Sequence, residues 1–219
     1  MQFPLSLSFK ILALAPQVYV RDASGVVQMY VRQKLMKLKE AVTVFADESQ
    51  TTPLYTINAD RVIDWSARYN IAEAGTGTPL GSVKRQGMRS IWKAHYEVER
   101  DGAVVMTVRE ANPWVKVMDH VLGEIPGIGL LTGYFLHPAY LVSSADGTQI
   151  MKLVKEPAFM EGRFRLESTS AASEADERLA VLSLLMMLLL EHGRPLAGGP
   201  KFEDERSYYG DFYGQRRPR

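Results

Sequence analysis

Apolar and polar residues alternate along much of the chain with a period of two. In the segment Trp92–Arg100, Ala94, Tyr96 and Val98 share one face, and His95 and charged residues share the other. This pattern is typical of a β-strand with one face in water. Asp101-Gly102 then predicts a two-residue hairpin turn, followed by a returning strand. Similar hairpins are predicted for residues 17–31 and 140–154, where short turns contain Gly25 and Gly147.

A weak internal repeat connects three of the predicted strands. The segments begin at Val31 (Val-Arg-Gln-Lys), Val83 (Val-Lys-Arg-Gln) and Leu153 (Leu-Val-Lys-Glu), and another strand follows each of them. Their spacing is too irregular for a solenoid. The repeat therefore indicates hairpins copied within one domain.

One segment departs from the strand pattern. Leu179–Leu190 is apolar on every side except at Ser183, and a helix of this kind must be surrounded by protein or lipid. Ser173 and Asp176 form a capping-box pattern, and Gly193 with Pro195 predicts the end. We therefore expect a helix over residues 173–192. Its apolar part is much shorter than the roughly 20 residues that span a bilayer, so we expect a buried core helix and not a transmembrane one.

Composition narrows the class of protein. The chain has 219 residues, of which 46% are hydrophobic, and a formal net charge of +1. This charge gives no overall bias toward nucleic acid, and we expect no nucleic-acid partner. The absence of cysteine excludes disulfides and thiolate catalysis and fits a reducing, cytoplasmic compartment. The N-terminal 15 residues lack the leading positive charge of an export signal, so we expect a first strand there.

The composition changes after Pro195. Leu196-Ala-Gly-Gly-Pro200 is typical of a linker, and residues 201–219 combine aromatic residues with arginines. We expect one domain over residues 1–194 and a flexible, charged and aromatic tail over 195–219. The alternative is an arm that binds a partner, RNA or a membrane through stacking and phosphate contacts.

These elements resemble the LURP-one-related family, which is related to the phospholipid scramblases and to the tubby C-terminal domain. The resemblance rests on Arg32-Gln-Lys-Leu-Met-Lys-Leu38, a degenerate second copy at Lys84–Ser90, the hairpins and the Leu-rich terminal helix. It implies a mainly β fold: a closed antiparallel barrel of about twelve strands around one central hydrophobic helix, as in tubby-like domains. The helix would fill a barrel too wide for strand side chains alone. The core plugs would be Leu184, Leu185, Leu188 and Leu189.

The resemblance also bears on function. Tubby-like domains are associated with phosphoinositides, and scramblases with calcium-dependent lipid movement between leaflets. The chain has no cysteine for acylation and no calcium loop of the Asp-x-Asp/Asn-x-Asp/Asn-Gly kind, so scramblase-like lipid transfer is disfavoured. We expect a non-enzymatic binding module that recognises anionic phospholipid head groups at a membrane surface, peripheral to it. The alternative is a protein-interaction or scaffold domain that uses the tail or a barrel face.

Two basic stretches are the candidate head-group ligands. If their strands are neighbours, they form one cationic face that could hold an anionic head group; the residues are Arg32, Lys34, Lys84, Arg85 and Arg89. The other possibility is an ordinary solvated barrel exterior. We find no catalytic motif, no metal-ligand spacing among the histidines and no cofactor motif. An uncharacterised enzyme would need a pocket with convergent carboxylates, for instance at His95 or His137.

Overall fold

The computed structural model describes residues 1–10, 17–32, 41–61, 67–86, 95–111, 139–158 and 161–192. Within these residues the chain forms twelve strands and one long helix. The strands are β1 (Leu5–Lys10), β2 (Gln17–Arg21), β3 (Val27–Arg32), β4 (Ala41–Phe45), β5 (Pro53–Ala59), β6 (Arg68–Glu73), β7 (Pro79–Arg85), β8 (His95–Arg100), β9 (Ala103–Glu110), β10 (Ala139–Ser144), β11 (Gln149–Glu156) and β12 (Glu161–Ser168). The helix is α3 (Glu174–His192).

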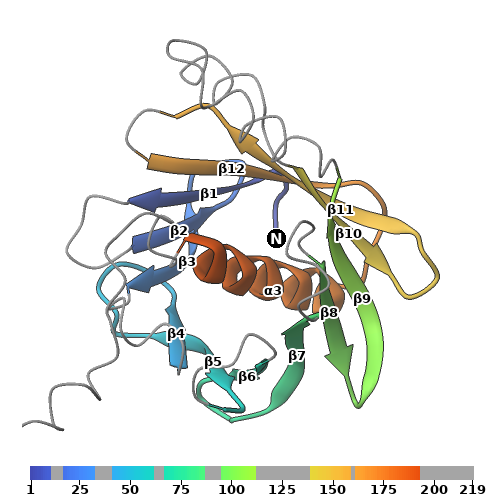
Figure 1. The fold of residues 1–219 in the computed structure, drawn as a ribbon. Helices are drawn as coiled ribbons and strands as arrows, with labels where there is room; N and C mark the ends of the chain where they lie inside the picture. Colours follow the sequence, from blue (N-terminus) through green and yellow to red (C-terminus); the bar gives the residue numbers. More distant parts are fainter. Residues whose placement is uncertain are drawn as a thin grey trace, which may run out of the picture.

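The strands form a closed barrel in which each strand pairs with the strands before and after it (Figure 1). All pairs are antiparallel, and β1 closes the barrel by pairing with β12 on one side and β2 on the other. Closure leaves no sheet edge open for pairing with another chain. The fold expected from the sequence, a mainly β barrel with one central helix, is confirmed.

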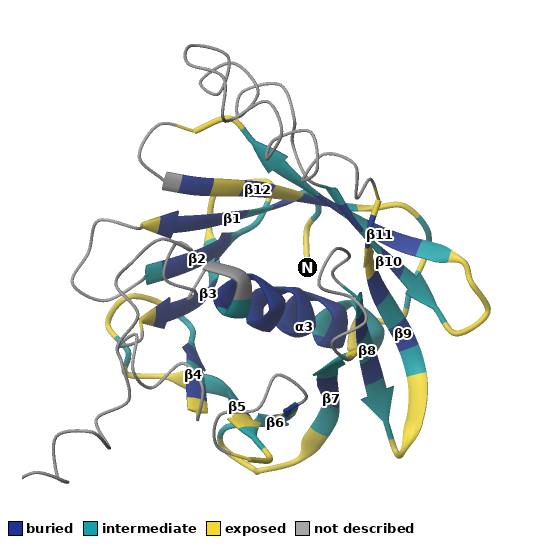
Figure 2. Cartoon of the chain, viewed as in Figure 1, coloured by how far each residue is buried: buried dark blue, intermediate teal, exposed yellow. Residues whose placement is uncertain are grey.

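Alternation of buried and partly exposed residues, clearest in β8, separates the barrel interior from its exterior. In β8, Tyr96 and Val98 are buried, whereas His95 and Glu97 on the other face are partly exposed (Figure 2). The predicted turn after β8 is also present: Asp101 and Gly102 both have positive φ, 52° and 78°. Two successive residues with positive φ match the right-handed twist of the flanking strands.

The helix α3 runs through the barrel (Figure 1). Its residues from Leu179 to Leu189 are all buried, and among them are the four leucines expected as core plugs: Leu184, Leu185, Leu188 and Leu189. Full burial of one such side chain contributes about 1.5–3 kcal/mol. The described part of the chain contains no helix that is both long and apolar enough to cross a membrane.

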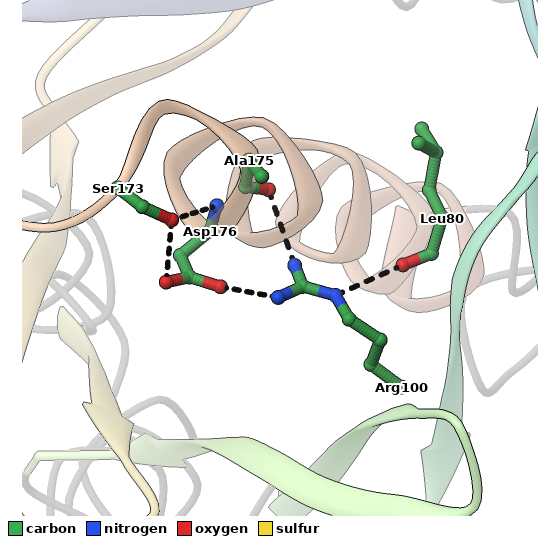
Figure 3. A network of polar contacts seen from close by, with 5 residues as sticks. All are labelled: Leu80, Arg100, Ser173, Ala175 and Asp176. Atoms are coloured by element: carbon green, nitrogen blue, oxygen red, sulfur yellow. Dashed lines mark hydrogen bonds and ion pairs between the residues drawn. The ribbon is translucent and has the colours of Figure 1, made fainter.

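The N-terminus of α3 is anchored to the barrel by polar contacts (Figure 3). The Asp176 amide donates to Ser173 Oγ at 3.1 Å, as the capping pattern predicts, and the Ser173 hydroxyl donates to Asp176 Oδ2 at 2.7 Å. Arg100, at the end of β8, donates to Asp176 Oδ1 at 2.8 Å. It also donates to the carbonyl oxygens of Ala175 and Leu80, each at 3.4 Å. These contacts join the helix to β7 and β8.

The weak sequence repeat corresponds to a rotational arrangement. Its three copies lie on β3, β7 and β11, and successive copies are four strands apart in the closed barrel of twelve. The first residue of each copy, Val31, Val83 and Leu153, is buried. Equivalent positions of the repeat therefore lie about a third of the barrel circumference apart.

Candidate cationic site on the barrel exterior

The outer face of β12, β1, β2 and β3 carries the candidate site. Leu7 and Phe9 of β1 belong to the core, so Ser6, Ser8 and Lys10 face outward. The same alternation directs Gln17, Tyr19 and Arg21 of β2 outward, because Val18 and Val20 belong to the core. Antiparallel pairing places Ser8 opposite Tyr19, and Tyr19 opposite Tyr30 of β3.

Tyr19 is the centre of this face. Its ring lies 5.0 Å from the Tyr30 ring, measured between centroids, and only 1% of Tyr19 is exposed although it lies outside the barrel core. The Arg21 guanidinium lies 4.4 Å and Lys10 Nζ 4.9 Å from the Tyr19 centroid. Both cations are within the range of a cation–π interaction with the same ring.

Hydrogen bonds fix the positions of these side chains. Lys10 Nζ donates to Tyr19 Oη at 3.5 Å, and the Tyr19 hydroxyl donates to Gln17 Oε1 at 3.1 Å. Arg21 Nη1 donates to Ser8 Oγ at 3.3 Å. Burial, followed by the neighbouring Tyr19, raises the pKa of Tyr30, so its phenol stays neutral. The groups that contact Lys10 and Arg21 here, Tyr19 and Ser8, are neutral. These contacts therefore do not neutralise the positive charges of Lys10 and Arg21.

Further cations lie on the same face. Arg32 is exposed and pairs across the strands with Gln17, which in turn pairs with Lys10. Arg163 lies opposite Ser8, and Arg165 opposite Ser6, which itself lies opposite Arg21. Neighbouring strands are about 4.8 Å apart, so the backbones of Arg165 and Arg21 are separated by about 10 Å. We call this set the basic face: Lys10, Arg21, Arg32, Arg163 and Arg165.

Carboxylates reduce the charge of this face at its β12 side. Arg165 Nε lies 3.0 Å from Glu167 Oε1, Glu156 of β11 is in register with Arg163, and Glu161 of β12 is in register with Lys10. The remaining side, from Lys10 to Arg32, carries the cation–π cluster. Arginine and lysine side chains of this kind bind phosphate oxygens through charge-assisted hydrogen bonds.

The other residues predicted from the sequence do not join Arg32. β3 and β7 are not neighbours, because β4, β5 and β6 lie between them. Lys84 on β7 lies between Arg68 and Glu97 in register, and Arg68 forms an ion pair with Glu99 at 3.0 Å. Lys34 and Arg89 lie outside the described residues.

Arg85 has a different environment from Lys84. It lies opposite Tyr96, which is 1% exposed and part of the core, so Arg85 is on the inward-facing side at the end of β7 and is only partly exposed. The barrel therefore does not bring Arg32 together with Lys84 and Arg85 on one face.

The described residues offer no evident metal site, since none of their His, Asp and Glu side chains gather in groups of three or more suited to a metal ion. His95 is partly buried, and burial, together with Arg109, lowers its pKa. Its Nε2 atom has no hydrogen-bond partner in the described part of the chain. His137 lies outside the described residues.

Sequence reasoning missed most of the basic face. Arg21 could have been recognised together with its neighbours Gln17 and Tyr19, because their spacing of two places them on one face of a predicted strand. Lys10, Arg163 and Arg165 could not, because only the pairing of β1 with β12 and β2 brings them to the same surface.

Comparison with known proteins adds the family. A family model described as LURP-one-related matches residues 27–187, which is most of the chain. The chain belongs to the LURP-one-related family. The match starts at β3 and ends within α3, so Lys10, Tyr19 and Arg21 precede the matched residues. Comparison with curated protein sequences gives no match. Among solved structures, the barrel is similar to a protein from Arabidopsis thaliana with 13% sequence identity and a TM-score of 0.48, covering 89% of this chain and 94% of that chain.

Proposed function

We propose that this LURP-one-related protein is a non-enzymatic binding module that recognises anionic phospholipid head groups, phosphoinositides among them, at the cytoplasmic surface of a membrane. The observation that carries the proposal is the placement of Lys10 and Arg21 on the buried ring of Tyr19, with Arg32 and Arg163 on the same face. The basic face provides the head-group ligands.

The cluster supports head-group binding because it is held in place before a ligand arrives. Tyr19 is fixed by burial and by Gln17, and Arg21 is fixed by the ring and by Ser8. A preorganised cation loses less conformational freedom on binding than a mobile surface lysine does. The guanidinium groups can also bind phosphate oxygens in a bidentate manner.

The expected strength is modest. A lysine or arginine close to an anionic membrane contributes about 1 kcal/mol, so the basic face contributes up to about 5 kcal/mol, less for Arg165 because Glu167 already accompanies it. A binding free energy of this size corresponds to a dissociation constant of roughly 0.1–1 mM. We therefore expect salt-sensitive, reversible, peripheral binding.

Vesicle co-sedimentation tests the proposal. The purified protein is mixed with phosphatidylcholine vesicles, and with the same vesicles containing a minor fraction of phosphatidylinositol bisphosphate, at low and at moderate salt. We expect binding only to the anionic vesicles and weaker binding at moderate salt. The double variant Lys10→Gln/Arg32→Gln should bind roughly 30-fold more weakly, because two contributions of about 1 kcal/mol are lost.

A matched control removes the same charge elsewhere on the exterior. Lys84→Gln/Arg109→Gln changes the net charge equally, but Lys84 and the exposed Arg109 lie on β7 and β9, and we expect at most a few-fold loss. Equal losses in both double variants would show a non-specific charge effect and contradict the site. Absence of binding to either kind of vesicle would overturn the function and favour a protein partner.

A further inference from the structure

Two cations of the basic face approach Tyr19 from opposite directions along β2. Gln17, Tyr19 and Arg21 follow one another on the outer face of this strand. Arg21 lies two residues beyond Tyr19, whereas Lys10 is in register with Gln17, two residues before it. Positions 17 and 21 are four residues apart, which corresponds to about 13 Å along a strand. Lys10 and Arg21 therefore reach the ring from its two sides.

The side chains of Lys10 and Arg21 lean toward each other and remain separated by the ring. Lys10 Nζ lies 4.9 Å and Arg21 Cζ 4.4 Å from the Tyr19 centroid, so the two charges are at most about 9 Å apart. The ring lies between their two strand positions, and the bond from its hydroxyl to Gln17 holds it there. The ring therefore occupies the space in which one phosphate group would contact both cations.

Hydrogen-bond donors form a row beside Lys10. Gln17 is in register with Lys10 on one side and with Arg32 on the other, so the three residues cross β1, β2 and β3. Gln17 Oε1 accepts from the Tyr19 hydroxyl, which leaves the amide nitrogen, a donor, for a ligand. Two cations and an amide donor match the acceptor oxygens of one phosphate group. We call Lys10, Gln17 and Arg32 the first subsite.

A second group of donors surrounds Arg21. Its Nη1 donates to Ser8 Oγ at 3.3 Å, and Ser8 is in register with Arg163 of β12. The Arg21 guanidinium is thus held toward β1, beside the strand that carries Arg163. Glu156 is in register with Arg163, so Arg21 is the main cation for a ligand here. We call Ser8, Arg21 and Arg163 the second subsite.

From this arrangement we infer that the basic face holds two phosphate groups at once, one at each subsite, and that they belong to two neighbouring lipids of the bilayer. The inference rests on the proposed function, because it concerns the number of head groups bound at the same site. Adjacent phosphates of one head group are fixed to neighbouring carbons of one ring, which keeps them close together. Neighbouring lipids, in contrast, move freely in the plane of the bilayer until both subsites are filled.

Binding of two lipids makes the protein sensitive to their density in the membrane. Once one head group is bound, the second comes from the lipids within reach, and their density sets its effective concentration. Far from saturation, the amount of bound protein then rises with the square of the lipid fraction. Doubling the fraction should raise binding about four-fold, against about two-fold for a single head group.

Vesicle co-sedimentation of the full chain measures this dependence. The probe is phosphatidic acid, whose head group is a single phosphate, in phosphatidylcholine vesicles. Phosphatidylserine replaces phosphatidic acid as its fraction falls, so the general attraction of a basic surface to an anionic membrane stays nearly constant. Above the binding to phosphatidylserine alone, we expect about four-fold more bound protein when phosphatidic acid is doubled at low occupancy. A rise of about two-fold would overturn the inference.

Three variants with the same loss of charge assign the head groups to the subsites. Lys10→Gln disables the first subsite and Arg21→Gln the second, so each should bind more weakly and respond only about two-fold to the doubling. Arg165→Gln is the control, because Arg165 lies outside both subsites and has Glu167 Oε1 at 3.0 Å. It should keep the full response. An unchanged response in Lys10→Gln and Arg21→Gln, with folding checked by thermal unfolding, would contradict the two subsites.

The same titration with phosphatidylinositol bisphosphate tests the other source of two phosphates. We expect a response of about four-fold again. A two-fold response to this lipid would show that one head group reaches both subsites, and would overturn the assignment to neighbouring lipids. Vesicle-bound protein with a two-fold response to both lipids refutes only the second head group. Protein that sediments with none of the anionic vesicles refutes the proposed function itself.

Discussion

The Arg100 guanidinium lies 2.8 Å from the Asp176 carboxylate and joins the end of β8 to the first turn of α3. The two residues are far apart in sequence, and each is about one third exposed. Asp176 also completes the N-terminal cap through Ser173. The Asp176 carboxylate therefore takes part in the N-terminal cap of α3 and also holds the helix in the barrel (Figure 3).

Replacing Arg100 should weaken this anchor. Arg100→Gln removes the ion pair with Asp176 and the hydrogen bonds to two backbone carbonyls. Because the pair is partly exposed, solvent screening limits its contribution, and we expect a loss of about 1–2 kcal/mol in the free energy of unfolding. Urea unfolding followed by circular dichroism measures the change.

Arg178→Gln serves as the control for Arg100. Arg178 forms an i,i+4 pair with Glu174 at 2.7 Å on the same helix, and pairs of this kind contribute about 0.3–0.5 kcal/mol. If the two variants lost the same stability, the link between β8 and α3 would have no special role.

Acid should weaken the same anchor. The Ser173 hydroxyl bond, followed by the Arg100 guanidinium, lowers the pKa of Asp176 below the ordinary value of 3.8. A carboxyl group whose pKa is lower in the folded than in the unfolded state stabilises the fold fully above the unfolded pKa. The contribution is lost as the pH falls below 3.8 toward the folded pKa. We expect the stability difference between the wild type and Asp176→Asn to shrink over this range in urea titrations, and a constant difference would contradict this role.

Gly81 permits the close approach of β7, β8 and the helix. Its φ is +151°, and a Cβ atom at this position would lie 2.5 Å from the Glu99 carbonyl oxygen and 2.9 Å from Leu179 Cδ2. Gly81→Ala should therefore lower the free energy of unfolding by about 2 kcal/mol or more. Gly75→Ala is the matched control, because a Cβ atom there meets no atom within 4 Å. Comparable unfolding midpoints for the two variants would show that β7 can move away from the helix.

Ser183 is the polar exception in the buried part of α3. It is 0% exposed, and its Oγ has no hydrogen-bond partner in the described part of the chain. A buried hydroxyl without a partner costs about 1–3 kcal/mol, so Ser183→Ala should raise the free energy of unfolding by about 1 kcal/mol. Leu185→Ala, at a buried apolar position of the same helix, should instead lower it by about 2–5 kcal/mol. Destabilisation by Ser183→Ala in urea unfolding would refute the unpaired hydroxyl.

Much of this fold follows from local sequence patterns. The alternation in β8, the Asp101-Gly102 turn and the cap at Ser173 depend on residues close in sequence, and the structure contains all three. The all-round apolar segment also predicted the buried helix, because no surface position could accommodate it. The tail over 195–219 lies outside the described residues and stays a prediction.

The candidate site was less predictable for two physical reasons. Arg32 and Lys84 are equivalent positions of the internal repeat, and a repeat that runs around a closed barrel separates its copies instead of joining them. The basic face, in contrast, unites Lys10 with Arg163 from the other end of the chain through the pairing of β1 and β12. Strand pairing over such distances has no signal in a single sequence.

Lys10 and Arg165 of the basic face should contribute unequally to lipid binding. Lys10 Nζ lies over the neutral ring of Tyr19 and donates to its hydroxyl, whereas Arg165 has Glu167 Oε1 at 3.0 Å. An arginine with an adjacent carboxylate must share its charge between that carboxylate and a phosphate. We therefore expect Lys10→Gln to weaken binding to anionic vesicles about five-fold, and Arg165→Gln about two-fold or less.

The companion variant Glu167→Gln tests the reason for this difference. Removal of the carboxylate should free Arg165 and strengthen vesicle binding, and the gain should vanish in Arg165→Gln/Glu167→Gln. Because Glu167 is 45% exposed, the change should leave the fold intact, which thermal unfolding can confirm. If Glu167→Gln left vesicle binding unchanged, Arg165 would lie outside the surface that meets the lipid, and the basic face would be confined to β1, β2, β3 and Arg163.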